Sequence, residues 1–238
     1  MWRHSLLPAI AARFARLPSY GGRMACVQPF ALLAAALMVL LACPIVAAER
    51  PVRIVALGDS LTAGLGLPAD ATFPAKLERA LRAKGLAAEI VNAGVSGDTA
   101  SGGLARLDWS VPEGTDAVIV ELGANDMLMG VDPNVTRGAL AEIVRRLAER
   151  RIAVLLAGMR AAPNLGADYG RDFETIYSEL AARNDVLLYP FFLEGIAATS
   201  ELNQRDGLHP TAAGVDVIVE RILPKVEELI ARVREKRG

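Results

Sequence analysis

VRIVALGDS, at residues 52–60, carries the clearest structural signal in the chain. Its first six residues form a short apolar run that ends at Gly58, which is typical of a buried strand that leads into a turn. Four more apolar runs follow along the chain, and segments with helical spacing of their apolar residues separate them. Strands that alternate with helices in this way predict a parallel sheet that is covered on both faces.

The predicted elements occupy most of the chain after residue 48. The strands are expected at 52–57, 88–91, 116–122, 152–156 and 186–188. The helices are expected at 73–84, 101–109, 133–150, 168–183 and 211–234. Right-handed crossovers between the strands then give a three-layer α/β/α domain with a five-stranded, parallel, doubly wound sheet of the flavodoxin-like type. No repeat or linker divides residues 49–238, so we predict a single domain there.

Residues 1–48 differ in composition from the rest of the chain. Four arginines precede an uncharged stretch at 24–48, which contains an apolar run of 14 residues at 30–43 and small residues at 46–48. A basic start, a short apolar core and small residues before a cleavage point are typical of a secretory signal. We therefore predict export to the periplasm or the medium, with cleavage near Ala48.

Two alternatives to a cleaved signal remain open. A transmembrane anchor needs about 20 apolar residues, which is more than this run supplies. A lipoprotein attached through Cys43 is the other alternative, because residues 40–43 (LLAC) resemble a lipobox.

Removal of the leader changes the composition of what remains. The whole chain has 26 basic and 27 acidic residues, and four arginines leave, so 22 basic residues remain and the net charge becomes −5. Both cysteines leave as well, and His209 is the one histidine in residues 49–238. This composition argues against a nucleic-acid partner, a cysteine nucleophile and a multi-histidine metal site. Histidine-dependent chemistry would have to use His209.

Short segments rich in glycine and small polar residues follow the first three predicted strands and precede the last helix. Functional groups collect at the carboxyl ends of the strands in doubly wound sheets, so these segments are the candidates for chemistry. They are GDSLTAG at 58–64, NAGVSGDT at 92–99, GAND at 123–126 and DGLHP at 206–210.

Asp206, His209 and Ser60 form the first candidate constellation. A turn between Asp206 and His209 can bring the carboxylate to Nδ1 and leave Nε2 free as a base. Ser60 lies at a strand-to-helix turn, and its hydroxyl needs such a base to become a nucleophile. The alternatives are an Asx turn at Asp206 and a helix N-cap at Ser60.

Gly97 and Asn125 form the second candidate constellation. The Gly97 N–H, the Asn125 side-chain amide and the Ser60 N–H are suitable donors for the oxyanion of an acyl-transfer intermediate. Taken singly, Gly97 is as well explained as a turn glycine and Asn125 as an Asx turn. The joint pattern favours acyl transfer.

In these four segments the sequence resembles the SGNH hydrolases, also called GDSL esterases and lipases, over roughly residues 52–235. It looks most like their bacterial arylesterase, acyl-CoA thioesterase I and lysophospholipase branch. The resemblance implies an SGNH hydrolase fold, Ser60 as nucleophile, His209 as general base and acid, and Asp206 as the group that orients the imidazole. It also implies an oxyanion hole made by Ser60, Gly97 and Asn125, an acyl-enzyme intermediate, and neither a metal nor a cofactor.

The loops at 160–170 and 190–205 are expected on the acyl side of the site. The candidate lining residues are Met159, Leu165, Tyr169, Phe191, Phe192, Leu193 and Ile196. A structural role in covering the sheet is the alternative for them. We expect a monomer that acts on a small ester or lipid substrate and touches membrane lipid transiently.

Two functions of other classes compete with an esterase. Residues 58–66 form a glycine-rich loop before a helix, which suits a non-catalytic, flavodoxin-like module that binds phosphate or another anion. That loop lacks the G-x-x-x-x-G-K-[ST] pattern, and this interpretation leaves the Asp206 and His209 pair unexplained. A metal phosphoesterase built on aspartates 59, 98, 126 and 206 is the third interpretation, and a single histidine argues against its two-metal site.

Overall fold

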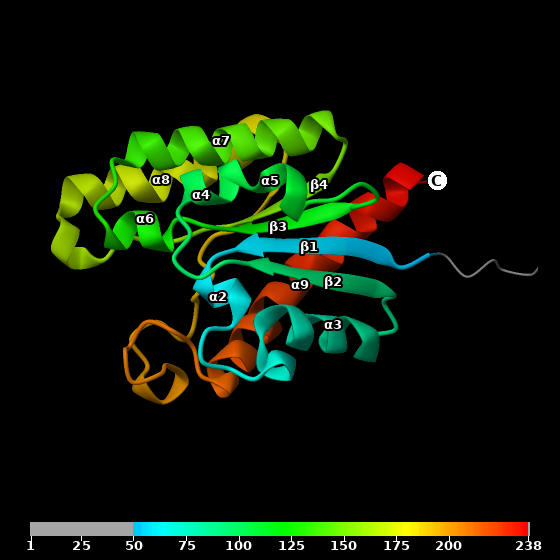
Figure 1. Cartoon of the computed structure of the whole chain (residues 1–238), viewed down its shortest axis with the longest axis horizontal. Coiled ribbons are helices and arrows are strands. Elements are labelled where there is room, and N and C mark those ends of the chain that lie inside the picture. The colour runs from blue at the N-terminus through cyan, green and yellow to red at the C-terminus, as the bar shows by residue number, and fades with distance from the viewer. Residues whose placement is uncertain (1–49, 238) are drawn as a thin grey trace, which may run out of the picture. The chain divides into compact units, whose positions relative to one another are not determined.

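The computed structural model describes residues 50–237, so the leader predicted at 1–48 lies outside the described residues. Five parallel strands form one sheet in the order β2-β1-β3-β4-β5 (Figure 1). The strands are β1 (Val52–Gly58), β2 (Ala88–Gly94), β3 (Ala117–Glu121), β4 (Ala153–Ala157) and β5 (Leu187–Tyr189). This order is that of a flavodoxin-like, doubly wound sheet and confirms the predicted fold.

Helices cover both faces of the sheet, as Figure 1 shows. On one face α3 (Phe73–Ala83) packs against α9 (Ala212–Arg237). The other face carries α4 (Ala100–Ala105), α5 (Leu107–Ser110), α7 (Pro133–Glu149) and α8 (Ala167–Asn184). Their apolar faces are buried as the periodicity predicts, because a parallel sheet requires cover on both sides.

Burial along the strands explains why their apolar runs could be recognised in the sequence. Every residue of β3 and β4 is buried, and β1 is buried except at Arg53. Such strands are apolar on both faces and show no alternation with period two. Within residues 50–237, the structure contains no helix with the length and apolarity that crossing a bilayer would require.

The structure differs from the predicted elements in three places. The helix predicted at 101–109 is two helices, α4 and α5, which are separated at Arg106. β2 continues to Gly94 because its ladder with β1 extends to the pair Gly58 and Gly94, beyond the β-branched residues that mark the strand. Two short helices follow strands directly, α2 (Ser60–Ala63) and α6 (Ala124–Leu128), and both are too short to show helical periodicity.

The strand order places a topological switch point between β1 and β3. The chain leaves β1 toward one edge of the sheet to form β2 and returns to the other side of β1 to form β3. Loops at the carboxyl ends of such a pair diverge and leave a crevice. Ser60 follows β1 and Asn125 follows β3, so both lie at this crevice.

Candidate active site

Ser60 is the first residue of α2 and is not its N-cap. The cap is Asp59, whose Oδ1 accepts a hydrogen bond from the Leu61 N–H at 2.9 Å. Because the neighbouring carboxylate caps the helix, the Ser60 hydroxyl is left for another partner. That partner is His209, whose Nε2 lies 2.8 Å from the Ser60 Oγ.

Asp206 makes both of the contacts that its position in the sequence suggested. Its Oδ1 accepts hydrogen bonds from the backbone N–H groups of Leu208 at 2.9 Å and His209 at 3.0 Å, which forms an Asx turn. Its Oδ2 lies 2.7 Å from His209 Nδ1. These bonds lower the pKa of Asp206 to about 2, and the two bonds from the backbone contribute most. An ionised carboxylate cannot donate, so Nδ1 carries the proton and Nε2 is free to accept from Ser60.

The loop that carries His209 is held by a residue that sequence reasoning missed. The Gln204 N–H donates to the His209 carbonyl at 2.7 Å, and the Gln204 side chain donates to the carbonyls of Leu65 at 2.7 Å and Pro210 at 3.0 Å. Gln204 therefore joins the His209 loop to the segment that follows Ser60. No local pattern marks it, because Leu65 is 139 residues away.

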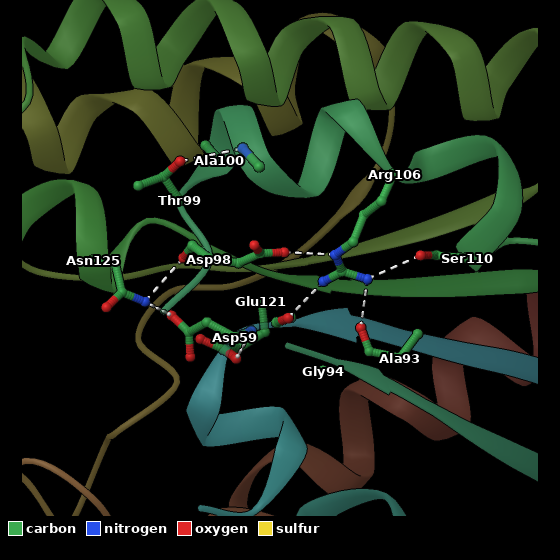
Figure 2. Close-up of polar contacts among 12 residues, drawn as sticks. Asp59, Ala93, Gly94, Asp98, Thr99, Ala100, Arg106, Ser110, Glu121 and Asn125 are labelled. Carbon is green, nitrogen blue, oxygen red and sulfur yellow. Dashed lines mark hydrogen bonds and ion pairs between the residues drawn. The ribbon is translucent and has the colours of Figure 1, made fainter. Parts of the chain in front are cut away.

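Asn125 follows β3, and Gly97 lies in the loop that follows β2. The Asn125 amide donates to the Asp98 carbonyl at 2.9 Å and to the Asp59 Oδ2 at 3.1 Å (Figure 2). Gly97 has a φ of 87°, in a turn that the Asp98 N–H closes on the Val95 carbonyl at 3.1 Å. A Cβ at Gly97 would have nothing within 4 Å, so this position requires glycine for its left-handed backbone rather than for space.

Two buried carboxyl groups lie under Ser60, and neither was singled out from the sequence as part of this arrangement. Glu121 is the last residue of β3, and its Oε2 accepts from the Thr62 hydroxyl at 2.8 Å and from the Asp59 N–H at 3.4 Å. Burial, and then the charge of Asp59, raise the pKa of Glu121 well above its ordinary value. Burial raises the pKa of Asp59 to about 6.

A small apolar cavity of about 120 Å³ opens beside Ser60 and His209. Three of the predicted lining residues, Met159, Phe191 and Leu193, line it, together with Leu61, Met127 and Leu128. Two larger hollows, of about 490 and 660 Å³, lie away from Ser60 and His209 and contain neither residue.

The other four predicted lining residues do not line this cavity. Phe192 and Ile196 are fully buried in the core, where the Phe192 ring meets the Phe73 ring edge-on with 5.0 Å between centroids. The Tyr169 hydroxyl donates to the Val131 carbonyl at 2.9 Å. Leu165 ends a short 3₁₀ helix at Pro163–Leu165 and is half-buried. An apolar loop residue can face either the substrate or the core, and the sequence does not distinguish them.

The contacts of the site aspartates also bear on the two competing functions, an anion-binding module and a metal phosphoesterase. The first turn of α2 is already capped by the Asp59 carboxylate, which occupies the place that a phosphate would take. Asp98 pairs with Arg106, and Asp126 accepts from the Ala100 N–H and the Thr136 hydroxyl at 2.8 Å each. Among the side chains of residues 50–237, no three His, Cys, Asp or Glu groups converge as a metal site would need.

A doubly wound parallel sheet with a serine, histidine and aspartate in hydrogen-bonded series at its switch point is the arrangement expected of a serine hydrolase. The family model of the GDSL-like Lipase/Acylhydrolase family matches residues 56–217. The chain belongs to this family.

Several characterised relatives are similar to most of the described chain. The esterase TesA of Pseudomonas aeruginosa is 36% identical over 178 residues, which cover 74% of this chain and 89% of TesA. The arylesterase of Vibrio mimicus is 37% identical over 174 residues, which cover 73% of this chain and 87% of the relative.

Solved structures of esterases are also similar to this chain. The crystal structure of AlinE4, an SGNH-hydrolase family esterase, has 48% sequence identity and a TM-score of 0.64, and the match covers 76% of this chain and 96% of AlinE4. The crystal structure of TesA has 36% identity and a TM-score of 0.71, and the match covers 74% of this chain and 99% of TesA.

Proposed function

We propose that this serine ester hydrolase works through Ser60 as nucleophile, His209 as general base and acid, and Asp206 as the group that orients the imidazole. The observation that carries the proposal is the unbroken series of two hydrogen bonds, from Ser60 Oγ to His209 Nε2 at 2.8 Å and from His209 Nδ1 to Asp206 Oδ2 at 2.7 Å. Both bonds have the length needed for proton transfer or for fixing a tautomer.

The reaction follows from this series. His209 Nε2 takes the Ser60 proton as Oγ bonds to the ester carbonyl carbon, and the carbonyl oxygen becomes an oxyanion. The tetrahedral intermediate collapses, the bond to the leaving alcohol or thiol breaks, and His209 Nε2 gives that group its proton. Water then gives a proton to His209 and attacks the acyl-Ser60. The second tetrahedral intermediate collapses, the bond to Ser60 Oγ breaks as His209 returns the proton to that oxygen, and the carboxylic acid leaves.

The oxyanion hole in this proposal consists of the N–H groups of Ser60 and Gly97 and the Asn125 amide. The Ser60 N–H is in the first turn of α2, where no intrahelical acceptor is available. Both hydrogens of the Asn125 amide are already engaged, so an oxyanion would share the one given to Asp59, whose bond is the longer at 3.1 Å.

Replacement of Asn125 by alanine should lower kcat by on the order of 10²–10³ and leave KM nearly unchanged, because the lost donor acts on charge that develops in the transition state. Steady-state hydrolysis of p-nitrophenyl butyrate measures both constants. Asn134→Ala is the matched control, since Asn134 bonds to Asp132 at the start of α7. A wild-type kcat in Asn125→Ala would remove Asn125 from the oxyanion hole.

The substrate class we propose is carboxylic esters with an apolar acyl chain, which includes aryl esters, thioesters and lysophospholipids. Support comes from the apolar side chains around the cavity and from the names of the relatives, which include an arylesterase and a thioesterase 1/protease 1/lysophospholipase L1 of Escherichia coli. The acyl chain would lie against Met159, Phe191 and Leu193.

The value of kcat/KM should rise along a p-nitrophenyl ester series from acetyl toward medium chains. Burial of one methylene contributes about 0.8 kcal/mol, which is roughly a fourfold gain for each carbon until the cavity is full. Phe191→Ala should flatten this rise, and Leu165→Ala, outside the cavity, should leave it unchanged. A sharp preference for acetyl in the parent enzyme would contradict an acyl site here.

We also propose that the enzyme is exported as a monomer after cleavage near Ala48. The basic start, the apolar run at 30–43 and the small residues before Glu49 support this proposal. The intact mass of the exported protein is the test. A lipid-modified mass that begins at Cys43 would replace cleavage at Ala48 by lipoprotein processing.

A further inference from the structure

Arg106 lies between α4 and α5, is 5% exposed, and has no place in the catalytic series described above. Its guanidinium donates to four acceptors, as Figure 2 shows for most of them. Nε donates to Asp98 Oδ2 at 2.5 Å and Nη2 to the Gly58 carbonyl at 2.8 Å. Nη1 donates to the Ala93 carbonyl at 2.8 Å and the Ser110 Oγ at 3.0 Å. A buried arginine thus joins three separate segments.

The acceptors of Arg106 stand directly beside the proposed oxyanion donors. Gly58 is the last residue of β1, two residues before Ser60, and Asp98 follows Gly97. The Asp98 carbonyl is itself the acceptor of the Asn125 amide at 2.9 Å. Ser60 is therefore two residues, and Gly97 one residue, from a group that Arg106 binds. Asn125 is one hydrogen bond away from such a group.

The hydrogen bonds of the ladder between β1 and β2 do not involve the Arg106 side chain. The ladder between β1 and β2 is complete as far as Gly58 and Gly94, and the Gly58 carbonyl already accepts from the Val95 N–H at 3.0 Å. The guanidinium adds a second donor to a carbonyl that already has one. Its contacts therefore tie the ends of β1 and β2, at the Gly58 and Ala93 carbonyls, to Asp98 in the loop after β2.

Three hydrogen bonds hold that loop beside Gly97: the Val95 N–H donates to the Gly58 carbonyl at 3.0 Å, the Asp98 N–H to the Val95 carbonyl at 3.1 Å, and the Asn125 amide to the Asp98 carbonyl at 2.9 Å. A Cβ at Gly97 would meet nothing within 4 Å, so the side of Gly97 that a side chain would occupy is open. The loop is held at its ends, by the Asp98 contact with Arg106 and by the Ala100 N–H, which donates to Asp126 Oδ2 at 2.8 Å. The Asp98 contact with Arg106 is thus one of several attachments that set the position of the Gly97 N–H.

We propose that Arg106 is a positioning residue that sets the geometry of the oxyanion hole, by fixing Asp98 and the end of β1 so that the Ser60, Gly97 and Asn125 donors converge. The inference rests on the proposed function. Arginine suits the task because its planar guanidinium presents five N–H donors in a fixed fork, whereas a lysine ammonium is a single point on a flexible stem. Misplacement of such donors by about 1 Å can cost on the order of 10²-fold in rate.

Arg106→Lys keeps the charge and removes the fork, and we expect kcat on p-nitrophenyl butyrate to fall by about 10- to 100-fold. KM and the acid limb of the pH profile of kcat/KM should remain as in the parent enzyme, because the bonds among Ser60, His209 and Asp206 are untouched. Arg137→Lys is the matched control, since Arg137 also contacts several acceptors, on α8, and is remote from Ser60. A purely structural role of Arg106 would lower the thermal midpoint of Arg106→Lys and leave kcat of the folded protein intact, which would overturn the proposal.

A double-mutant cycle with Asn125→Ala separates positioning from an independent effect. If Arg106 acts through the oxyanion hole, Arg106→Lys should cost a smaller factor in the Asn125→Ala background than in the parent enzyme. Losses that multiply in full would overturn the proposal. A wild-type kcat in Arg106→Lys beside an impaired Asn125→Ala would overturn the role of Arg106 alone, while a wild-type kcat in Asn125→Ala would remove the Asn125 donor and the inference together.

Chemical rescue provides a second, independent readout. Arg106→Ala leaves a cavity among the four acceptors, and millimolar guanidinium should restore part of the lost kcat by occupying it. Ethylammonium at the same concentration should restore less, because it lacks the planar fork. Equal rescue by both cations would mean that only charge is needed and would overturn the positioning role. If Arg106→Ala does not fold, Arg106→Lys and the cycle decide the matter.

Discussion

Ser60→Ala should abolish hydrolysis of a short p-nitrophenyl ester, with kcat lower by on the order of 10⁴–10⁶. Without the hydroxyl no acyl-enzyme can form, and the water reaction assisted by the oxyanion hole alone is slow. The fold should be unaffected, because Asp59 and not Ser60 caps α2. Steady-state kinetics together with a thermal melt measure both expectations.

Ser178→Ala is the control for this substitution, since its hydroxyl donates only to the Thr175 carbonyl within its own helix. It should keep full activity. Incubation of the parent enzyme with a phosphonate ester should add one phosphonyl group to the intact mass, and Ser60→Ala should not gain it. Activity or labelling that survives in Ser60→Ala would place the nucleophile elsewhere.

Asp206→Asn should lower kcat by on the order of 10³–10⁴. Asparagine keeps an oxygen for the backbone N–H groups of Leu208 and His209, so the turn should persist. Its amide nitrogen would face His209 Nδ1, where it can only donate. The imidazole proton would then move to Nε2, which could no longer accept the proton of Ser60.

The control and the pH dependence make this prediction specific. Asp168→Asn removes an exposed carboxylate in the first turn of α8 and should leave kcat unchanged. The pKa of Asp206 is lowered to about 2, from an unfolded value of about 3.9. Its contribution to stability is therefore present above pH 4 and lost as the pH falls toward 2. In Asp206→Asn this acid-dependent part of the stability should be absent, and a variant with wild-type kcat would contradict the orienting role.

The apolar strands and the four short candidate segments could be predicted because each is marked by a local sequence pattern. A strand buried on both faces is an unbroken apolar run, as in β4, and the four-residue turn from Asp206 to His209 has few conformations. The seven predicted lining residues could not be told apart from core residues in the sequence. Three line the cavity, and Phe192 and Ile196 lie in the core, because apolar character marks burial and not the partner that buries a side chain.

The residues that hold the site from around the proposed oxyanion donors could not be identified from the sequence in the same way. Glu121 stands at the end of an apolar strand, and a carboxyl group in that place is a signal that could have drawn attention to it. Arg106 and Gln204 carry no comparable signal. Their partners Gly58 and Leu65 are 48 and 139 residues away, and either side chain would suit an exposed position equally well.

The sequence by itself determined the class of fold, the order of its elements and the single histidine available to a serine nucleophile. These are properties of composition and of patterns that repeat within ten or twenty residues. Only the tertiary structure decided that Asp59 caps α2 in place of Ser60, that burial raises the pKa of Glu121, and that Arg106 holds Asp98 beside Asn125. The physical reason is that a side chain's hydrogen-bond partners and its pKa depend on which distant strand ends are brought together at one edge of the sheet.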